Sequence, residues 1–169
     1  MPDTTTALGG LNAAPPDRAA AELLACCASR AFAARVAAGR PYAGLDELLA
    51  AAGRAVLELA WPDVLEALAA HPRIGERAGG DGREAAWSRQ EQSGAEDAPR
   101  DELAAGNRAY EARFGHVYLV CATGLSGAEL LARLRARLDN DEEAERAVVR
   151  GELAKITRLR LVKLLEGER

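Results

Sequence analysis

Apolar residues recur at intervals of three and four along most of the chain, the spacing that places them on one face of a helix. The clearest example is the run Leu45, Leu48, Leu49, Ala52, Val56 and Leu59. Alanine and leucine dominate, runs of β-branched residues are scarce and only seven aromatic residues occur, so strands are not favoured. The pattern predicts an all-α fold, a single-domain helical bundle of about eight helices.

Capping residues, prolines and glycines mark the expected helix ends. Ser29 is a competing N-cap, and if it is used the first helical region divides into two short helices before Gly39. Ser126 and Glu129 form a capping box at the start of a later helix, and we expect Arg133, Arg135 and Arg137 of that helix to lie on its exposed face. The first predicted helices start at Asp17, Leu45 and Trp61, and two more cover 84–92 and 103–114. The last two predicted helices run from Ser126 to Asn140 and from Asp141 onward.

Two segments are not expected to be helical. Residues 1–16 are small, polar and proline-bearing, so we expect a flexible N-terminal tail or a loosely docked arm before a single helical domain over 17–169. The stretch HVYLVCATG, beginning at His116, has a strand-like composition. Because a lone strand cannot make a sheet, we expect an extended segment near 116–122 that lies on the helices, with backbone groups able to meet a ligand.

Charge and cysteine content narrow the class of protein. With 22 basic and 26 acidic residues the net charge is -4, which gives no reason to expect nucleic acid as a partner. The three cysteines show neither a disulfide framework nor a metal-binding spacing, which fits the reducing cytoplasm. The N-terminus lacks a basic, apolar leader, and there is no run of about 18 apolar residues, so neither export nor a membrane partner is indicated.

Candidate chemistry gathers between His71 and Gln92. His71 is one of two histidines and precedes a proline, which places it at a helix C-terminus. A glycine-rich bend over 78–82 could fold the chain back and bring His71 within reach of Glu91. Ser88, Glu91 and Gln92 can share one face of a short helix. The alternative is a structural histidine near solvated surface residues.

An arginine interrupts the apolar stripe of the last helix. At about 100° per residue, Arg160 falls at the centre of the stripe formed by Val149, Leu153, Ile156 and Leu164. A buried cation there requires an internal carboxylate, for which Glu91 is a candidate, or a bound anion. Histidines and cysteines do not supply a metal site, so no metal is expected. Nucleotide-binding and hydrolase motifs are also missing from the sequence.

Four motifs occur together in a fixed order: His71-Pro72-Arg73-Ile74-Gly75, Trp87-Ser88 with Glu91-Gln92, Asn107-x-x-Tyr110-x-x-x-Phe114-Gly115, and Ile156 with Arg160-Leu161. In this combination the chain resembles the 2-oxo-4-hydroxy-4-carboxy-5-ureidoimidazoline (OHCU) decarboxylases, from about Leu11 to Leu165. The resemblance implies an all-helical enzyme of urate degradation that needs no cofactor. Its small-molecule substrate, OHCU, would lose carbon dioxide to give (S)-allantoin, and a homodimer is the candidate assembly.

The resemblance also implies roles for individual residues. His71 would donate the proton, Glu91 would orient the substrate and keep His71 protonated, and Arg160 would bind a substrate oxygen that gains negative charge. Further residues implied in substrate binding are Pro72, Ser88 and Gln92, and the last two would hydrogen-bond the ureido and imide groups. The backbone of four residues would line the pocket: Leu119, Val120, Cys121 and Ala122.

The sequence departs from the family pattern after Gly115. Many relatives have an aromatic residue and a proline there, whereas this chain reads His116-Val117-Tyr118, so the pocket wall carries over less directly. A second hypothesis is a catalytically silent helical protein-interaction module on the same scaffold. Because His71, Glu91 and Arg160 are all retained, the enzyme is favoured.

Overall fold

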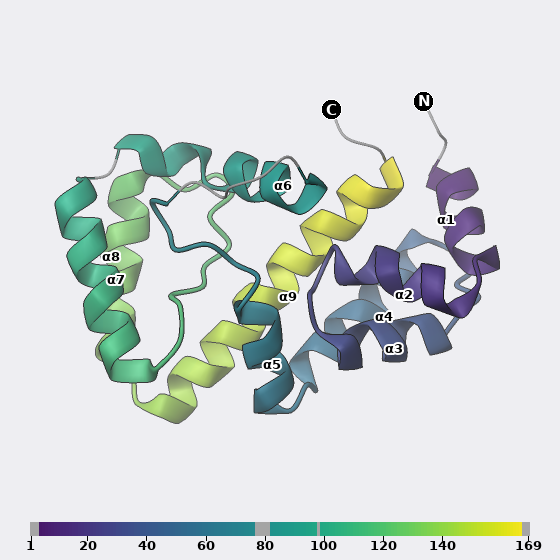
Figure 1. Ribbon diagram of the computed structural model, residues 1–169, viewed down its shortest axis with the longest axis horizontal. Helices are drawn as coiled ribbons and strands as arrows, with labels where there is room; N and C mark the ends of the chain where they lie inside the picture. The colour runs from purple at the N-terminus through teal and green to yellow at the C-terminus, as the bar shows by residue number, and fades with distance from the viewer. Residues whose placement is uncertain (1–3, 77–81, 98, 167–169) are drawn as a thin grey trace. The chain divides into compact units, whose positions relative to one another are not determined.

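The computed structural model describes residues 4–76, 82–97 and 99–166. In this part of the chain every regular element is helical, with nine α-helices and one short 3-10 helix (Figure 1). The prediction of an all-α fold is confirmed. By its contacts the chain divides into two compact units, one from Met1–Ala67 with Leu153–Arg169 and the other from Leu68–Glu152. We describe each unit separately.

The first unit contains the N-terminal helices. They are α1 (Thr4–Ala13), α2 (Pro16–Leu24), α3 (Arg30–Ala38), α4 (Leu45–Leu57) and all but the last residue of α5 (Trp61–Leu68), joined by the C-terminal part of α9 (Glu142–Glu166). Helix α2 packs against α3, and α3 packs against α4. Ser29 is the N-cap of α3 and accepts a hydrogen bond from the Phe32 N–H at 3.2 Å. The first helical region is therefore two helices, as the competing N-cap allowed.

Helix α1 occupies the segment where we expected a flexible tail. Leu8 and Leu11 are buried, and the Asn12 side chain bonds both the N–H and the carbonyl of Tyr42, at 2.9 Å each. Arg40 donates to the carbonyls of Leu11 and Ala14 near the C-terminus of α1. An unanchored tail is therefore wrong for residues 4–13, while the mobility of this arm stays a prediction.

The second unit holds most of the predicted site. Its helices are α6 (Arg83–Glu91), the 3-10 helix η1 (Ser93–Asp97), α7 (Arg100–Phe114), α8 (Gly127–Arg137) and the first part of α9. Helices α7 and α8 pack side by side (Figure 1). Helix α7 ends at Gly115, whose φ of 81° is the left-handed conformation that glycine adopts readily. The predicted capping box of Ser126 and Glu129 begins α8. Of the glycine-rich bend, only Gly82 lies within the described residues.

The segment between α7 and α8 is extended, as predicted. Residues 117–122 form no regular secondary structure, and four of them are buried: Tyr118, Leu119, Val120 and Ala122. Tyr118, Val120 and Ala122 join a hydrophobic cluster with residues of α7 and α8, which includes Leu103, Tyr110, Leu130, Leu131 and Leu134. The extended segment is therefore built into the core of the second unit.

One expectation for α8 is wrong. We placed Arg133, Arg135 and Arg137 on its exposed face, but Arg137 is only 8% exposed. It follows Leu130 by seven residues, and about 100° per residue returns it to nearly the same direction. No helix in the described part of the chain is long and apolar enough to cross a membrane.

Candidate active site

The loop after α5 carries the predicted proton donor. The His71 side chain is half-buried, and the backbone N–H of His71 donates to the carbonyl of Leu68 at 3.0 Å. Pro72 follows and cannot donate a backbone hydrogen bond, so the helix stops here as predicted. Further along the loop Ile74 is buried, and Gly75 has a φ of 93°. The loop is thus anchored in the second unit at both ends.

Helix α6 presents the predicted polar residues. Ser88 is buried, Glu91 is only 8% exposed, and half-buried Gln92 is the C-cap of the helix. The alternative in which Glu91 is a solvated surface residue is therefore wrong. Burying a carboxylate costs free energy unless charges or donors compensate it. A buried serine and glutamate on one short helix are suited to holding a polar ligand.

Gln92 joins the two ends of the predicted site. The Gly75 N–H donates to Gln92 Oε1 at 3.0 Å, so the chain folds back and brings the histidine loop to the end of α6. The contact between the His71 and Glu91 side chains stays a prediction.

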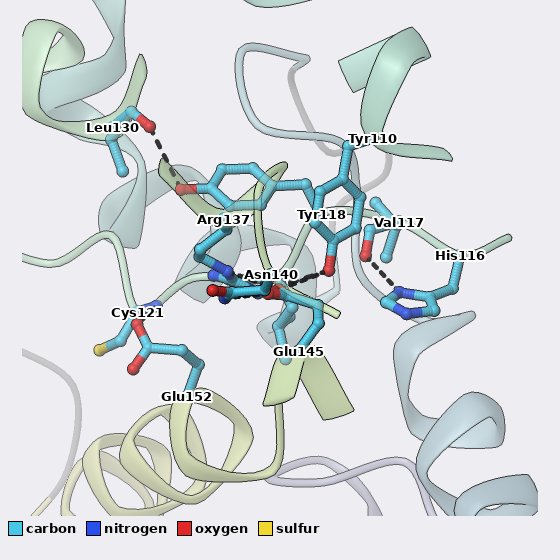
Figure 2. A network of polar contacts seen from close by, with 11 residues as sticks. Tyr110, His116, Val117, Tyr118, Cys121, Leu130, Arg137, Asn140, Glu145 and Glu152 are labelled. Carbon is cyan, nitrogen blue, oxygen red and sulfur yellow. Dashed lines mark hydrogen bonds and ion pairs between the residues drawn. The ribbon is translucent and has the colours of Figure 1, made fainter. Parts of the chain in front are cut away.

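A buried polar network holds the backbone of the extended segment (Figure 2). Arg137 Nη1 donates to the Leu119 carbonyl at 2.6 Å, and the Cys121 N–H donates to Glu152 Oε1 at 3.2 Å. The Tyr118 hydroxyl donates to the Leu130 carbonyl at 3.2 Å, and burial raises the pKa of Tyr118 to about 12. The backbone predicted to line the pocket is therefore held by charged side chains from α8 and α9.

The centre of this network is an ion pair between Arg137 and Glu145. Arg137 Nε lies 2.6 Å from Glu145 Oε1, and Glu145 is fully buried. Tyr110 donates to the same carboxylate at 2.8 Å, and Asn140 Nδ2 donates to it at 3.1 Å. Burial opposes the charge of Arg137, but the hydrogen bond to Glu145, the charge of that carboxylate and smaller contributions from Tyr110 and Tyr118 together outweigh burial, so the pKa of Arg137 is raised. With its oxygens accepting several donors, this buried pair is well compensated.

Arg137 and Glu145 were not among the predicted residues, although a signal for them was present. Glu145 is four residues before Val149 and Arg137 is seven after Leu130, so each continues an apolar stripe. The reasoning that singled out Arg160 therefore also applies to them. Asn107 was noted only as part of a motif, and the structure shows that its Nδ2 donates to the Ile74 carbonyl at 2.8 Å.

Arg160 lies in the other unit, on the C-terminal part of α9. It is 5% exposed, and the predicted stripe residues Val149, Leu153 and Ile156 are buried. Arg158 is exposed. The prediction that Arg160 is the buried arginine of this helix is confirmed. Its position relative to His71 and Glu91 stays a prediction, since the units are described separately.

No group of three or more histidine, cysteine, aspartate or glutamate side chains suited to a metal ion is found among the described residues. The polar and charged side chains buried in the described part of the chain are Ser29, Ser88, Glu91, Asn107, Arg137, Glu145, Glu152, Thr157 and Arg160. On an all-helical scaffold they define a helical enzyme whose site offers acid–base and hydrogen-bonding groups.

The chain belongs to the OHCU decarboxylase family, whose model matches residues 12–162. The uric acid degradation bifunctional protein TTL of Arabidopsis thaliana is 32% identical over 149 residues, which cover 85% of this chain and 46% of that protein. The chain thus spans about half the length of this relative. An OHCU decarboxylase of Haloferax volcanii is 28% identical, over 80% of this chain and 82% of its own. That of Amia calva is 33% identical, over 79% of each chain.

Solved structures show the same fold. An OHCU decarboxylase crystallised in the presence of (S)-allantoin is 32% identical, has a TM-score of 0.73 and is matched over 86% of this chain and 98% of its own. An (S)-allantoin synthase structure, 21% identical with a TM-score of 0.67, covers 93% of this chain and 53% of its own. The second match supports the fold alone.

Proposed function

We propose that this chain removes carbon dioxide from OHCU and yields (S)-allantoin, a step of urate degradation. The observation that carries the proposal is the family match over residues 12–162, which spans every predicted site residue. The match to an OHCU decarboxylase solved with (S)-allantoin supports it. No cofactor is required in this proposal, because the substrate's own heterocycle can accept the electron pair.

The reaction needs a proton donor held at a fixed position and a group that stabilises the negative charge that develops on the substrate. The bond from the ring carbon to the carboxyl group breaks, carbon dioxide leaves, and the electron pair moves into the ring. His71 then delivers a proton to one face of that carbon, which sets the configuration of the product. Arg160 stabilises the substrate oxygen on which charge develops, since its planar guanidinium can donate two parallel hydrogen bonds.

The remaining residues orient the substrate in this proposal. Glu91 is buried, and its charge favours the protonated form of His71 and fixes the ring or the ureido arm. Pro72 and Ser88 contact the substrate. Gln92 directs Oε1 to Gly75, which assigns its Nε2 as the donor to the ureido or imide group. The backbone of Leu119, Val120, Cys121 and Ala122 lines the pocket.

Turnover separates this proposal from a silent interaction module. Purified protein added to freshly generated OHCU should accelerate loss of the substrate far above its spontaneous decay, in proportion to protein concentration. Decay at the spontaneous rate at every protein concentration would favour the interaction module instead. A homodimer and a cytoplasmic location complete the proposal, and light scattering of the purified protein tests the first.

A further inference from the structure

We infer that Asn107 and Gln92 are positioning residues that clamp one peptide group of the histidine loop. Asn107 Nδ2 donates to the Ile74 carbonyl at 2.8 Å, and the Gly75 N–H donates to Gln92 Oε1 at 3.0 Å. That carbonyl and that N–H belong to the same planar peptide group. Each side of the group is held by one amide side chain, so two directed hydrogen bonds set its orientation.

The loop lies along α7 in antiparallel order. Three successive turns of the helix each meet one loop residue: Glu111 pairs with Arg73, Asn107 bonds Ile74, and Leu103 lies against Gly75. Arg73 Nε is 2.9 Å from Glu111 Oε2. Residues four apart on a helix share a face, so a single face of α7 contacts three consecutive residues of the loop. Asn107 makes the middle contact, and its hydrogen bond to the loop is buried.

The orientation of the clamped peptide requires a glycine at position 75. Its φ of 93° is a conformation that other residues rarely adopt. A Cβ built on Gly75 would lie 2.8 Å from Leu103 Cδ2. Glycine adopts positive and negative φ about equally readily, so the backbone alone does not fix this orientation, and the two amides are the groups that bond the peptide there.

Local stability does not account for an asparagine at position 107. Its Nδ2 must face the Ile74 carbonyl, because the reversed amide would set two oxygens against each other. Oδ1 is then buried and has no hydrogen-bond partner within the described part of the chain. An unsatisfied buried acceptor lowers stability, so the benefit of Asn107 is the donor that it offers to the loop.

This inference rests on the proposed decarboxylase. Ile74 is three residues after His71, and Gln92 directly follows Glu91, so the clamp ties the backbone beside the proton donor to the end of α6. A misplacement of about 1 Å can cost on the order of a hundredfold in rate. Loss of the clamp should therefore lower kcat more than it raises KM.

The test is Asn107→Asp, which preserves shape but replaces the donor with a carboxylate. The Gly75 amide should exchange with solvent at least tenfold faster than in the unmodified protein, measured by NMR on isotopically labelled protein. Turnover of OHCU should fall at least tenfold in kcat, with KM changed less than threefold. Unchanged exchange at Gly75 would overturn the clamp, and faster exchange with normal kcat would overturn its role in positioning.

Asn12→Asp is the matched control. Asn12 also donates from Nδ2 to a backbone carbonyl, that of Tyr42, but it lies in the other unit. Its replacement should leave both Gly75 exchange and kcat unchanged. Equal effects of the two variants would mean that general destabilisation, and not the clamp, is being measured.

If Asn107→Asp does not fold, a second pair of variants tests the clamp from the Gln92 side. Gln92→Glu retains an acceptor for the Gly75 N–H, whereas Gln92→Met removes it, so exchange should accelerate in the methionine variant alone. Equal exchange in both would contradict the clamp. Because exchange is measured without substrate, this arm decides the inference even if the unmodified protein fails to decarboxylate OHCU, an outcome that overturns only the proposed function.

Discussion

Arg158 and Arg160 lie two residues apart on α9, and the first is exposed whereas the second is buried. Two residues correspond to a rotation of about 200° around a helix, so the two side chains project from opposite sides of α9. Only Arg160 shares its side with the apolar stripe. A buried guanidinium is suited to binding a developing negative charge, which is why the proposed substrate contact is given to Arg160 and not to Arg158.

Arg160→Lys should reduce turnover roughly tenfold or more, because an ammonium retains the charge but cannot reproduce the paired hydrogen bonds of the guanidinium. Arg158→Lys is the matched control, with the same chemical change on the exposed side, and should be nearly silent. Initial rates on fresh OHCU compare the two. A silent Arg160→Lys beside an impaired Arg158→Lys would show that the wrong arginine has been assigned.

His71→Ala should lower kcat about a hundredfold or more, the contribution expected of a positioned proton donor. The half-buried ring carries little of the core, so helical circular dichroism and the melting temperature should change little. His116→Ala is the control. His116 contacts the rings of Tyr110 and Phe114, and its loss should affect stability more than turnover. Normal kcat in His71→Ala would remove His71 from the mechanism.

Arg137→Met should destabilise the protein by about 3–5 kcal/mol, because it leaves the fully buried Glu145 carboxylate without its cation. Arg135→Met makes the same change at a surface pair, where Arg135 lies 3.4 Å from Glu102, and should have little effect. Urea unfolding measures both. Adding Glu145→Gln to Arg137→Met should recover part of the loss, and the absence of any recovery would argue against direct coupling.

Gly94→Ala and Gly53→Ala should change stability in opposite directions. A Cβ on Gly94 would collide with the backbone carbonyl of Leu125, which cannot move aside as a side chain can, so a loss of about 1–3 kcal/mol is expected. A Cβ on Gly53, inside α4, meets nothing within 4 Å, and alanine should add up to about 1 kcal/mol. Urea midpoints check the signs, and equal signs would contradict the packing of η1 against Leu125.

Helical periodicity predicted most of the fold. It identified the helices that bury Leu48, Leu130 and Leu153, and proline and capping rules located their ends. Helix α1 was missed because its sequence, TTTALGGLNA, is rich in residues of low helix propensity. Its docking through Asn12 and Arg40 depends on Tyr42 and on carbonyls of α1 itself, and such long-range bonds leave no periodic signal.

The candidate site was predictable to a different degree for each residue. Arg160 could be singled out because a cation on an apolar stripe is conspicuous, and its burial agrees. Asn107 could not be assigned a structural role, since its partner is a backbone carbonyl 33 residues away. Arg137 and Glu145 both continue apolar stripes, but Arg137 was expected on the exposed face of its helix and no prediction was made for Glu145. The roles of His71, Glu91 and Arg160 in chemistry remain predictions.

The configuration of the product tests the decarboxylase most directly. OHCU can be generated freshly from urate in the presence of this protein, and the circular dichroism of the allantoin can be followed as it forms. A proton donor held on one side of the substrate can serve only one face, so the account predicts (S)-allantoin in large excess, appearing faster than in the protein-free reaction. Racemic allantoin formed at the spontaneous rate would contradict it.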